Sequence, residues 1–244
     1  MKIWATMVGI WLAAALPAQL RGPDVELSVG VVAPFQRNPG SGPTAAATIN
    51  HGYRIGKVLY TRLGLGMHYR HFVVTDNENI GPAPGPQVFR RHFDLVQLNG
   101  LATLVLGFQV GEWSLELGTA YVPMLWSDAR LTTASYHANG VPVNPPLTRD
   151  VNFRTMPPPR FDGDYYYLDN ANWWGTAAVN TRLSPRLALG VTYRRNLGET
   201  VLVHTNAFEC SVVQECLRIF QFRRLIPAVT GTATLSLRYR LTSQ

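Results

Sequence analysis

The chain has 244 residues, of which 46% are hydrophobic and 15% are charged, and its formal net charge is +7. Soluble domains carry about 25% charged residues, so this composition argues against an ordinary soluble domain and favours a chain with a large apolar surface to cover. The length fits a single large all-β domain. The positive charge does not indicate a nucleic-acid partner, because the sequence contains no RNP-like or helix-turn-helix pattern.

The first eighteen residues predict a secretory signal peptide. Lys2 precedes an apolar run that extends from Ile3 to Leu16, and Leu16-Pro17-Ala18 provides a cleavage site after Ala18. The run is short for a helix that spans a membrane. We therefore expect residues 1–18 to be removed and residues 19–244 to form one exported domain, with an uncleaved membrane anchor as the alternative.

Eight later segments show apolar and polar residues in alternation, or a β-rich composition. Most of them reach the 9–11 residues that a tilted strand needs to cross a bilayer. They predict an all-β protein with about eight strands, at Val25–Pro34, Ala46–Ile55, Leu59–Val74, Phe93–Phe108, Trp113–Leu125, Asn170–Leu183, Arg186–Leu197 and Ile226–Leu241.

The alternation separates a bulky apolar face from a small or polar face. In Leu59–Val74 the apolar face carries Leu63, Leu65 and Met67, whereas glycines, arginines and a histidine alternate with them. Small residues suit a narrow interior. Aromatic residues stand toward strand ends, as in the interfacial girdles of membrane barrels; they are Trp113, Tyr121, Tyr193 and Tyr239. We therefore expect the apolar face to contact lipid and the polar face to line the lumen.

The connections between the predicted strands alternate in length. The short ones centre on Gly56-Lys57, Val110-Gly111-Glu112 and Ser184-Pro185. The long ones are Phe35–Ala45, Thr75–His92, Trp126–Asp169 and Gly198–Leu225. Short turns at one end and long loops at the other are typical of bacterial outer-membrane barrels. An even number of strands also places both ends of the chain on the short-turn, periplasmic side.

With its signal peptide, strand number, face pattern and connection lengths, the whole mature chain resembles the small eight-stranded outer-membrane β-barrels of the OmpA/OmpX-like kind. The resemblance implies a transmembrane antiparallel up-and-down β-barrel in the bacterial outer membrane, in contact with outer-membrane lipid and lipopolysaccharide. A ten-stranded barrel is the alternative if part of the third long loop forms a hairpin around Asn139-Gly140.

The alternation directs many charged residues into the lumen of this barrel. An eight-stranded barrel has an interior that side chains just fill, and unpaired charges are costly there. We expect a hydrated salt-bridge network, although an excess of arginines leaves open a narrow anion-preferring, porin-like pore. The predicted lumen residues are Glu26, Arg54, Arg62, His68, Arg70, Glu116, Arg182, Arg186, Arg194, Arg238 and Arg240.

An outer-membrane lipid-modifying enzyme is a third hypothesis. His68, His71 and His92 are predicted near the outer rim, with Asp76 and Asp94 close in sequence, and a base oriented by a carboxylate is the minimum for acyl transfer. No His-x-Ser element occurs in a predicted strand, however. We therefore expect rim histidines in ordinary hydrogen bonds, no catalytic residue and no cofactor.

The long loops suggest the main functional hypothesis. Loops of this length are usually functional or disordered. Cys210 and Cys216 predict a disulfide in an exported chain, and two thiols are too few to indicate a metal site. Tyr165, Tyr166 and Tyr167 offer contact area for a partner. The sequence thus favours a structural, adhesive or surface-binding role at the cell surface, toward an extracellular protein or ligand.

Overall fold

The computed structural model describes residues 19–34, 39–80, 87–137, 140–151, 163–169, 172–198, 201–207, 221–227 and 230–241. The predicted signal peptide and the predicted Cys210–Cys216 disulfide lie outside the described residues. Regular structure in the described residues is entirely β. In this part of the chain, no helix is long and apolar enough to cross a membrane.

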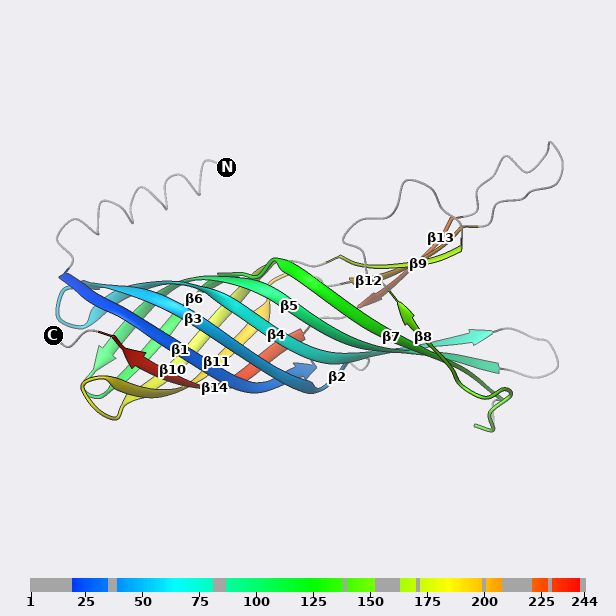
Figure 1. The fold of residues 1–244 in the computed structure, drawn as a ribbon, viewed down its shortest axis with the longest axis horizontal. Coiled ribbons are helices and arrows are strands. Elements are labelled where there is room, and N and C mark those ends of the chain that lie inside the picture. Colours follow the sequence, from blue (N-terminus) through cyan, green and yellow to red (C-terminus); the bar gives the residue numbers. More distant parts are fainter. Residues whose placement is uncertain are drawn as a thin grey trace.

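Eight of the described strands close into a ring, which confirms the predicted barrel (Figure 1). Each ring strand is antiparallel to both of its neighbours, and the first and last strands pair from Asp24↔Arg240 to Pro34↔Thr230. In chain order the strands are β1 (Gln19–Pro34), β3 (Gly42–Ile55), β4 (Leu59–Ile80), β5 (Gln87–Val110), β6 (Trp113–Tyr121), β10 (Trp173–Arg182), β11 (Leu187–Asn196) and β14 (Thr230–Arg240).

Tight turns connect the strands at one end of the barrel, where β1 begins and β14 ends; this is called the inner end below. Gly56 and Gly111 adopt φ values of 80° and 58° in two of these turns, a region that glycine enters without steric cost. In the third turn, the Ser184 hydroxyl oxygen accepts hydrogen bonds from the backbone N–H groups of Arg186 and Leu187 at 3.3 and 3.1 Å. The predicted short connections therefore form as expected.

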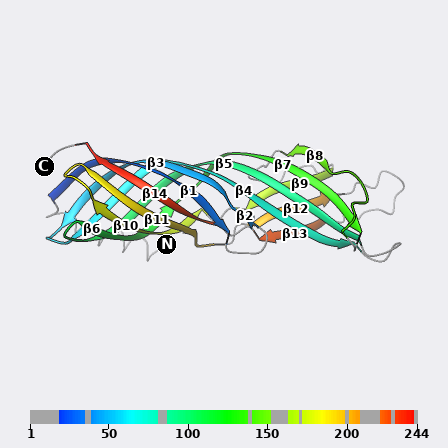
Figure 2. The same ribbon diagram turned by 90° about the horizontal axis from the view of Figure 1, so that it is seen from below.

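The strands at the opposite, outer end are longer than predicted (Figures 1 and 2). β4 and β5 have 22 and 24 residues and remain paired from Leu59↔Phe108 to Ile80↔Gln87. The prediction of a loop over Thr75–His92 is therefore wrong for most of its length. Continued pairing satisfies the backbone hydrogen-bonding groups of this segment, which a loop would have to leave to water.

β7 (Met124–His137) continues along β5 after a break that follows β6. The single predicted strand Trp113–Leu125 is therefore wrong at its end, because Pro123 has no N–H to donate to the ladder. Its carbonyl instead accepts a hydrogen bond from the Gly100 N–H at 2.8 Å. β8 (Leu147–Val151) folds back on β7 and forms the hairpin suggested around Asn139-Gly140, but it lies outside the ring and does not make a ten-stranded barrel.

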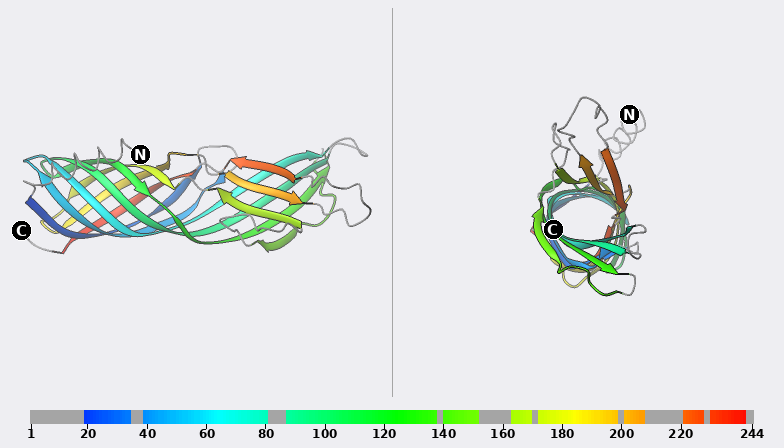
Figure 3. Two further views of the ribbon diagram at one scale, coloured as in Figure 1. Left: turned by 90° about the horizontal axis from the view of Figure 1, so that it is seen from above. Right: turned by 90° about the vertical axis from the view of Figure 1, so that its right-hand side faces the viewer.

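The remaining strands lie mostly within segments that were predicted as long loops. Ile226 and Pro227, the first two residues of the predicted last strand, belong to one of these strands, so the predicted start of the last strand is wrong. β2 (Pro39–Gly40) pairs with β4, whereas β9 (Gly163–Asp169), β12 (Val201–Ala207) and β13 (Gln221–Pro227) form a separate three-stranded sheet. Figure 3 shows this sheet beyond the ring, at the same end as the projecting parts of β4, β5 and β7. The outer end of the molecule is therefore largely built from strands.

Within the ring, the outward face is apolar and the inward face is polar. Leu65 is 71% exposed, whereas the inward-facing Thr232 and Glu116 are wholly buried. This confirms the predicted assignment of the two faces. Exposed aromatic residues stand at both margins of the apolar surface, with Trp113 and Tyr239 at the inner end and Tyr121, Trp126 and Trp173 at the outer end, as in a bilayer-spanning barrel.

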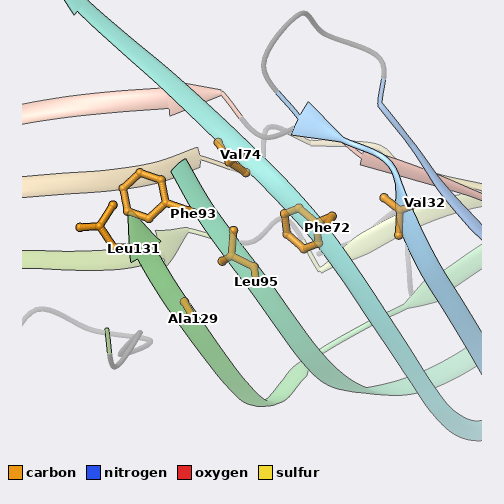
Figure 4. Packing of buried hydrophobic residues seen from close by; sticks show 7 residues of the cluster. All are labelled: Val32, Phe72, Val74, Phe93, Leu95, Ala129 and Leu131. Carbon is orange, nitrogen blue, oxygen red and sulfur yellow. The ribbon is translucent and has the colours of Figure 1, made fainter. Parts of the chain in front are cut away.

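Beyond the ring, the polarity of the two faces is reversed. The inward face of β4 changes from His68 and Arg70 to Phe72 and Val74, although strand alternation keeps all four on one face. The outward face of β5 changes from Leu98 to Asp94. Figure 4 shows the resulting apolar cluster, called the outer core below, which consists of Val32, Phe72, Val74, Phe93, Leu95, Ala129 and Leu131.

Candidate functional site in the barrel bore

A cycle of salt bridges crosses the bore in its inner half. Arg62 donates to Glu26 Oε2 at 2.6 Å and to Glu116 Oε2 at 2.5 Å. Arg238 donates to the same two oxygens, each at 3.0 Å. β1 and β6, which carry Glu26 and Glu116, lie opposite each other in the ring. The two arginines therefore tie opposite walls of the barrel together through charge-assisted hydrogen bonds.

Two further residues balance the charge of this layer. Arg194 Nη2 lies 3.9 Å from Glu26 Oε1, and Asp24 Oδ1 lies 3.8 Å from Arg238 Nε. The layer thus contains three arginines and three carboxylates, whereas the predicted set contained only two carboxylates. Asp24 was missed because the predicted strand began at Val25, although Asp24 shares the inward alternation of Glu26.

The middle of the bore is filled by a second layer of buried side chains. Arg70 donates to Gln97 Oε1 at 2.6 Å, and its guanidinium carbon lies 5.0 Å from the centre of the Trp174 ring. His68 Nε2 lies 2.9 Å from the Thr44 hydroxyl, and its ring meets Trp174 edge-on at 6.0 Å. β4 and β10, which carry Arg70 and Trp174, are three strands apart, so this layer also reaches across the bore.

Trp174 is a central bore residue that the sequence prediction did not include. Its exposure is 1%, and it shares its inward face with Ala178 and Asn180. The alternation within β10 could have placed it there. The sequence prediction considered only charged and titratable residues of the lumen, and so it missed an aromatic residue.

Several predicted lumen arginines lie at the inner mouth rather than in the salt-bridge layer, and for these the prediction of a network role is wrong. Arg54 donates to the carbonyls of Gly56 and Lys57, and Arg182 donates to that of Ser184. These two arginines and Arg186 are exposed. Their positions at strand ends and in a turn let long side chains reach water instead of staying in the bore.

The inner mouth contains a polar cavity of about 60 Å³. Arg182, Arg186 and Arg240 line it, together with Arg62 and Arg238 of the salt-bridge layer below. Asp24 and Glu112 are the carboxylates among its lining residues. The predicted lumen residues are therefore divided between a solvent-exposed inner mouth and two buried layers.

The predicted rim histidines do not come together. His71 contacts Asp94 on the outward face, and His92 Nδ1 lies 3.2 Å from the Thr75 hydroxyl. His68 is buried inside the barrel, and Asp76 pairs with Arg91 at 3.2 Å on the inward face. A histidine–carboxylate contact thus forms at His71 and Asp94, but the other members of the predicted group lie on different faces.

The loop residues proposed for binding are described only through their backbone. Tyr165, Tyr166 and Tyr167 lie in β9 and pair with Thr205, His204 and Val203 of β12. Within the described ranges, no three His, Cys, Asp or Glu side chains gather so that they could hold a metal ion.

No protein-family model and no curated protein matches the sequence. Among solved structures, the chain is similar to Ail, the attachment invasion locus protein of Yersinia pestis, in complex with the heparin analogue sucrose octasulfate. The identity is 10%, the coverage is 90% of this chain and 99% of that chain, and the TM-score is 0.34. It is also similar to Neisserial surface protein A, at 11% identity, 91% and 99% coverage and a TM-score of 0.34.

Matches at this level carry no argument about function. The assignment of the fold rests on the strand pairing of the chain itself, which closes an eight-stranded ring with tight turns at one end and long strands at the other. This is the architecture of the small outer-membrane barrels that the sequence resembles.

Proposed function

We propose that the chain is a non-enzymatic integral protein of the bacterial outer membrane, with a structural, adhesive or binding role at the cell surface. The exposed apolar surface between the two aromatic margins supports a position across a bilayer. Tyr121 and Trp173 of the outer margin pack at 5.2 Å between ring centres, and aromatic residues of this kind favour the interface between hydrocarbon and water.

The observation that carries this proposal is the reversal of polarity along β4 and β5. Beyond the ring, the inward faces of these strands form the outer core, and their outward faces carry Asn77, Arg90 and Asp94. This is the pattern of a sheet whose outward face meets water. A long hairpin with its own core would hold a surface rigidly outside the membrane, and a preorganised surface loses little entropy when it binds a partner.

Polar and aromatic contacts further order the projecting hairpin. Arg90 donates to Asn77 Oδ1 at 3.1 Å and lies over the Tyr136 ring at 5.1 Å. Arg91 lies over the Phe89 ring at 4.6 Å while it pairs with Asp76. Aromatic and arginine side chains are enriched in protein interfaces, so this hairpin is the part of the described chain best suited to recognition.

Binding can be tested with a shortened hairpin. Asp76 pairs with Arg91 in the ladder, so replacing residues 76–91 by Asn-Gly would join Thr75 to His92 through a two-residue turn and leave the outer core in place. We expect the full chain in nanodiscs to bind to arrays of extracellular-matrix proteins or surface glycans, and the shortened chain to lose that binding. A control in which residues 81–86 are replaced by Gly and Ser keeps both strands and should bind normally. Equal binding by the shortened chain would contradict the proposal.

A narrow pore is the competing function, and conductance separates the two. The salt-bridge cycle and the Arg70–Trp174 layer both cross the bore, and a blocked bore does not support ion flow. We expect no resolvable single-channel current in planar bilayers. A steady anion-selective current would favour the pore.

A further inference from the structure

The inner mouth gathers arginines that the salt-bridge cycle does not use. Arg62 and Arg238 are engaged with Glu26 and Glu116, but Arg182 and Arg186 are exposed, and the hydrogen bond of Arg182 is to an uncharged backbone carbonyl. Asp24 accepts a hydrogen bond from Asn50 at 2.8 Å and lies near Arg238, which leaves Glu112 as the other carboxylate that lines the cavity.

Backbone hydrogen bonds anchor the strand ends and the turn that carry these arginines. The Arg182 N–H donates to Glu112 O at 2.8 Å, and the Arg240 N–H donates to Arg186 O at 2.8 Å. The turn between Arg182 and Arg186 is also fixed by the Ser184 hydroxyl. Three arginines, at the end of β10, in the turn before β11 and at the end of β14, therefore line one cavity on a hydrogen-bonded backbone.

The chemistry of this group suits an anion with several oxygen atoms. A guanidinium presents a planar fork of donors that matches phosphate and carboxylate groups in a bidentate manner. The cavity of about 60 Å³ has room for about four to six water molecules. It can therefore accept one phosphate or carboxylate group, while a second group of the same ligand meets the exposed arginines at its edge.

We propose that the inner mouth is a binding site for a small anion that carries at least two phosphate or carboxylate groups. The ligand arrives from the aqueous compartment at the inner end. Arg182 and Arg240 share the inward alternation of Asn180 and Arg238, so they line the mouth of the bore and not the lipid-facing wall. A phospholipid headgroup, the other source of this chemistry, would have to leave the wall of the barrel to reach them.

Isothermal titration calorimetry of the full chain in a neutral detergent, with pyrophosphate as the probe, tests this site. We expect saturable binding that weakens as the salt concentration rises, because the site is open to solvent. The double variant Arg182→Gln/Arg186→Gln should weaken binding about tenfold or more, which is the loss expected for a charge-assisted hydrogen bond. Arg186→Lys keeps the positive charge but loses the planar fork of donors. Its affinity for pyrophosphate should therefore lie between those of the unaltered chain and the double variant.

The controls distinguish the site from general attraction to a positive protein. Arg149→Gln changes an exposed arginine of β8 and should leave pyrophosphate binding unchanged. Acetate, with one carboxylate, should bind the unaltered chain more weakly than pyrophosphate, a comparison that needs no variant. No binding of pyrophosphate, equal affinity for acetate, or equal weakening by Arg149→Gln would each overturn the proposal.

The source of the anion is tested in nanodiscs. Pyrophosphate should bind equally well in discs of phosphatidylcholine alone and in discs that also contain phosphatidylglycerol. If pyrophosphate does not bind, whereas phosphatidylglycerol associates with the chain and Arg186→Gln abolishes that association, the ligand is a lipid headgroup and the proposed soluble ligand is wrong.

Discussion

The inner and outer halves of β4 and β5 follow opposite rules on the same two faces. In the ring, Arg62 and His68 are buried while Leu63 and Leu65 are exposed; beyond it, Phe72 is buried. The difference follows from what surrounds each half. In the proposed position across a bilayer, hydrocarbon around the ring favours apolar side chains outside and leaves the bore to polar ones, whereas water around the projecting half drives apolar side chains inward. A single strand can therefore place its apolar residues on the outward face in its inner half and on the inward face in its outer half.

The largest expected loss of stability comes from a substitution in the inner half of the barrel. Glu116 is wholly buried and accepts hydrogen bonds from Tyr60, Arg62 and Arg238. Glu116→Ala leaves the buried Arg62 and the half-buried Arg238 with one remaining shared carboxylate, and breaking a buried ion pair in this way costs about 3–5 kcal/mol. The free energy of unfolding, measured by urea titration in lipid vesicles, should fall by that amount.

The matched control is Glu112→Ala, in the exposed turn just before β6. Away from buried networks, surface substitutions usually change stability by about 0.5 kcal/mol or less. If both glutamate variants lose the same stability, the salt-bridge cycle does not stabilise the barrel, and the comparison between a polar inner half and an apolar outer half loses its energetic basis.

The outer half should depend on apolar packing instead. Leu95 is wholly buried in the outer core, whereas Leu106 on the same strand is 43% exposed on the outward apolar face of the ring. Leu95→Ala removes packed atoms and leaves a cavity, at a cost of about 2–5 kcal/mol. Leu106→Ala should cost less, about 1–2 kcal/mol, because it loses the transfer of the removed methyl groups out of water but leaves no packed cavity. Equal losses in unfolding titrations of the two variants would show that the outer core is not packed.

Much of the ring could be predicted from the sequence because alternation has a fixed period. Residues two apart share a face, so Leu65 was correctly placed outside and Glu116 inside from the pattern alone. The pairing of particular charges could not be predicted in this way. The contacts of Arg62 with both Glu26 and Glu116 join three strands, and they depend on the curvature and tilt of the closed ring.

The outer ends of β4 and β5 were missed because a single polarity rule was applied to the whole chain. Phe72, Val74, Phe93 and Leu95 continue the alternation of their strands, but they place apolar residues on the face that was assigned to the lumen. A change of phase of this kind marks the point where the surrounding solvent changes. The sequence contained the signal, and a search for reversed alternation at the outer ends of the predicted strands Leu59–Val74 and Phe93–Phe108 could have found it.

Two arginine substitutions on the outward face of β4 can locate the boundary between the part of the strand in hydrocarbon and the part in water. Leu65 is 71% exposed in the ring, and Thr75 lies on the same face beyond it. Leu65→Arg puts a charge into hydrocarbon and should cost about 2–4 kcal/mol, whereas Thr75→Arg stays in water and should cost about 1 kcal/mol or less. The free energies of unfolding of the two variants, measured in lipid vesicles, are compared with that of the unaltered chain. A large cost at both positions would place Thr75 inside the bilayer and move the boundary outward.

The smallest of these expected losses of stability comes from replacing a single glycine in the inner half of the barrel. Gly107 lies between Tyr60 and Glu116 in the ladder, and a Cβ at this position would overlap the Tyr60 ring. The absence of a side chain lets Tyr60 pass over β5 and donate to Glu116 Oε1 at 2.6 Å. Gly107→Ala should therefore cost about 1–3 kcal/mol, as overpacking does, when measured by the same unfolding titration. In a Tyr60→Ala background the ring is gone, and the same glycine substitution should cost almost nothing; a cost that persists there would mean that the backbone of β5, and not the tyrosine, requires glycine.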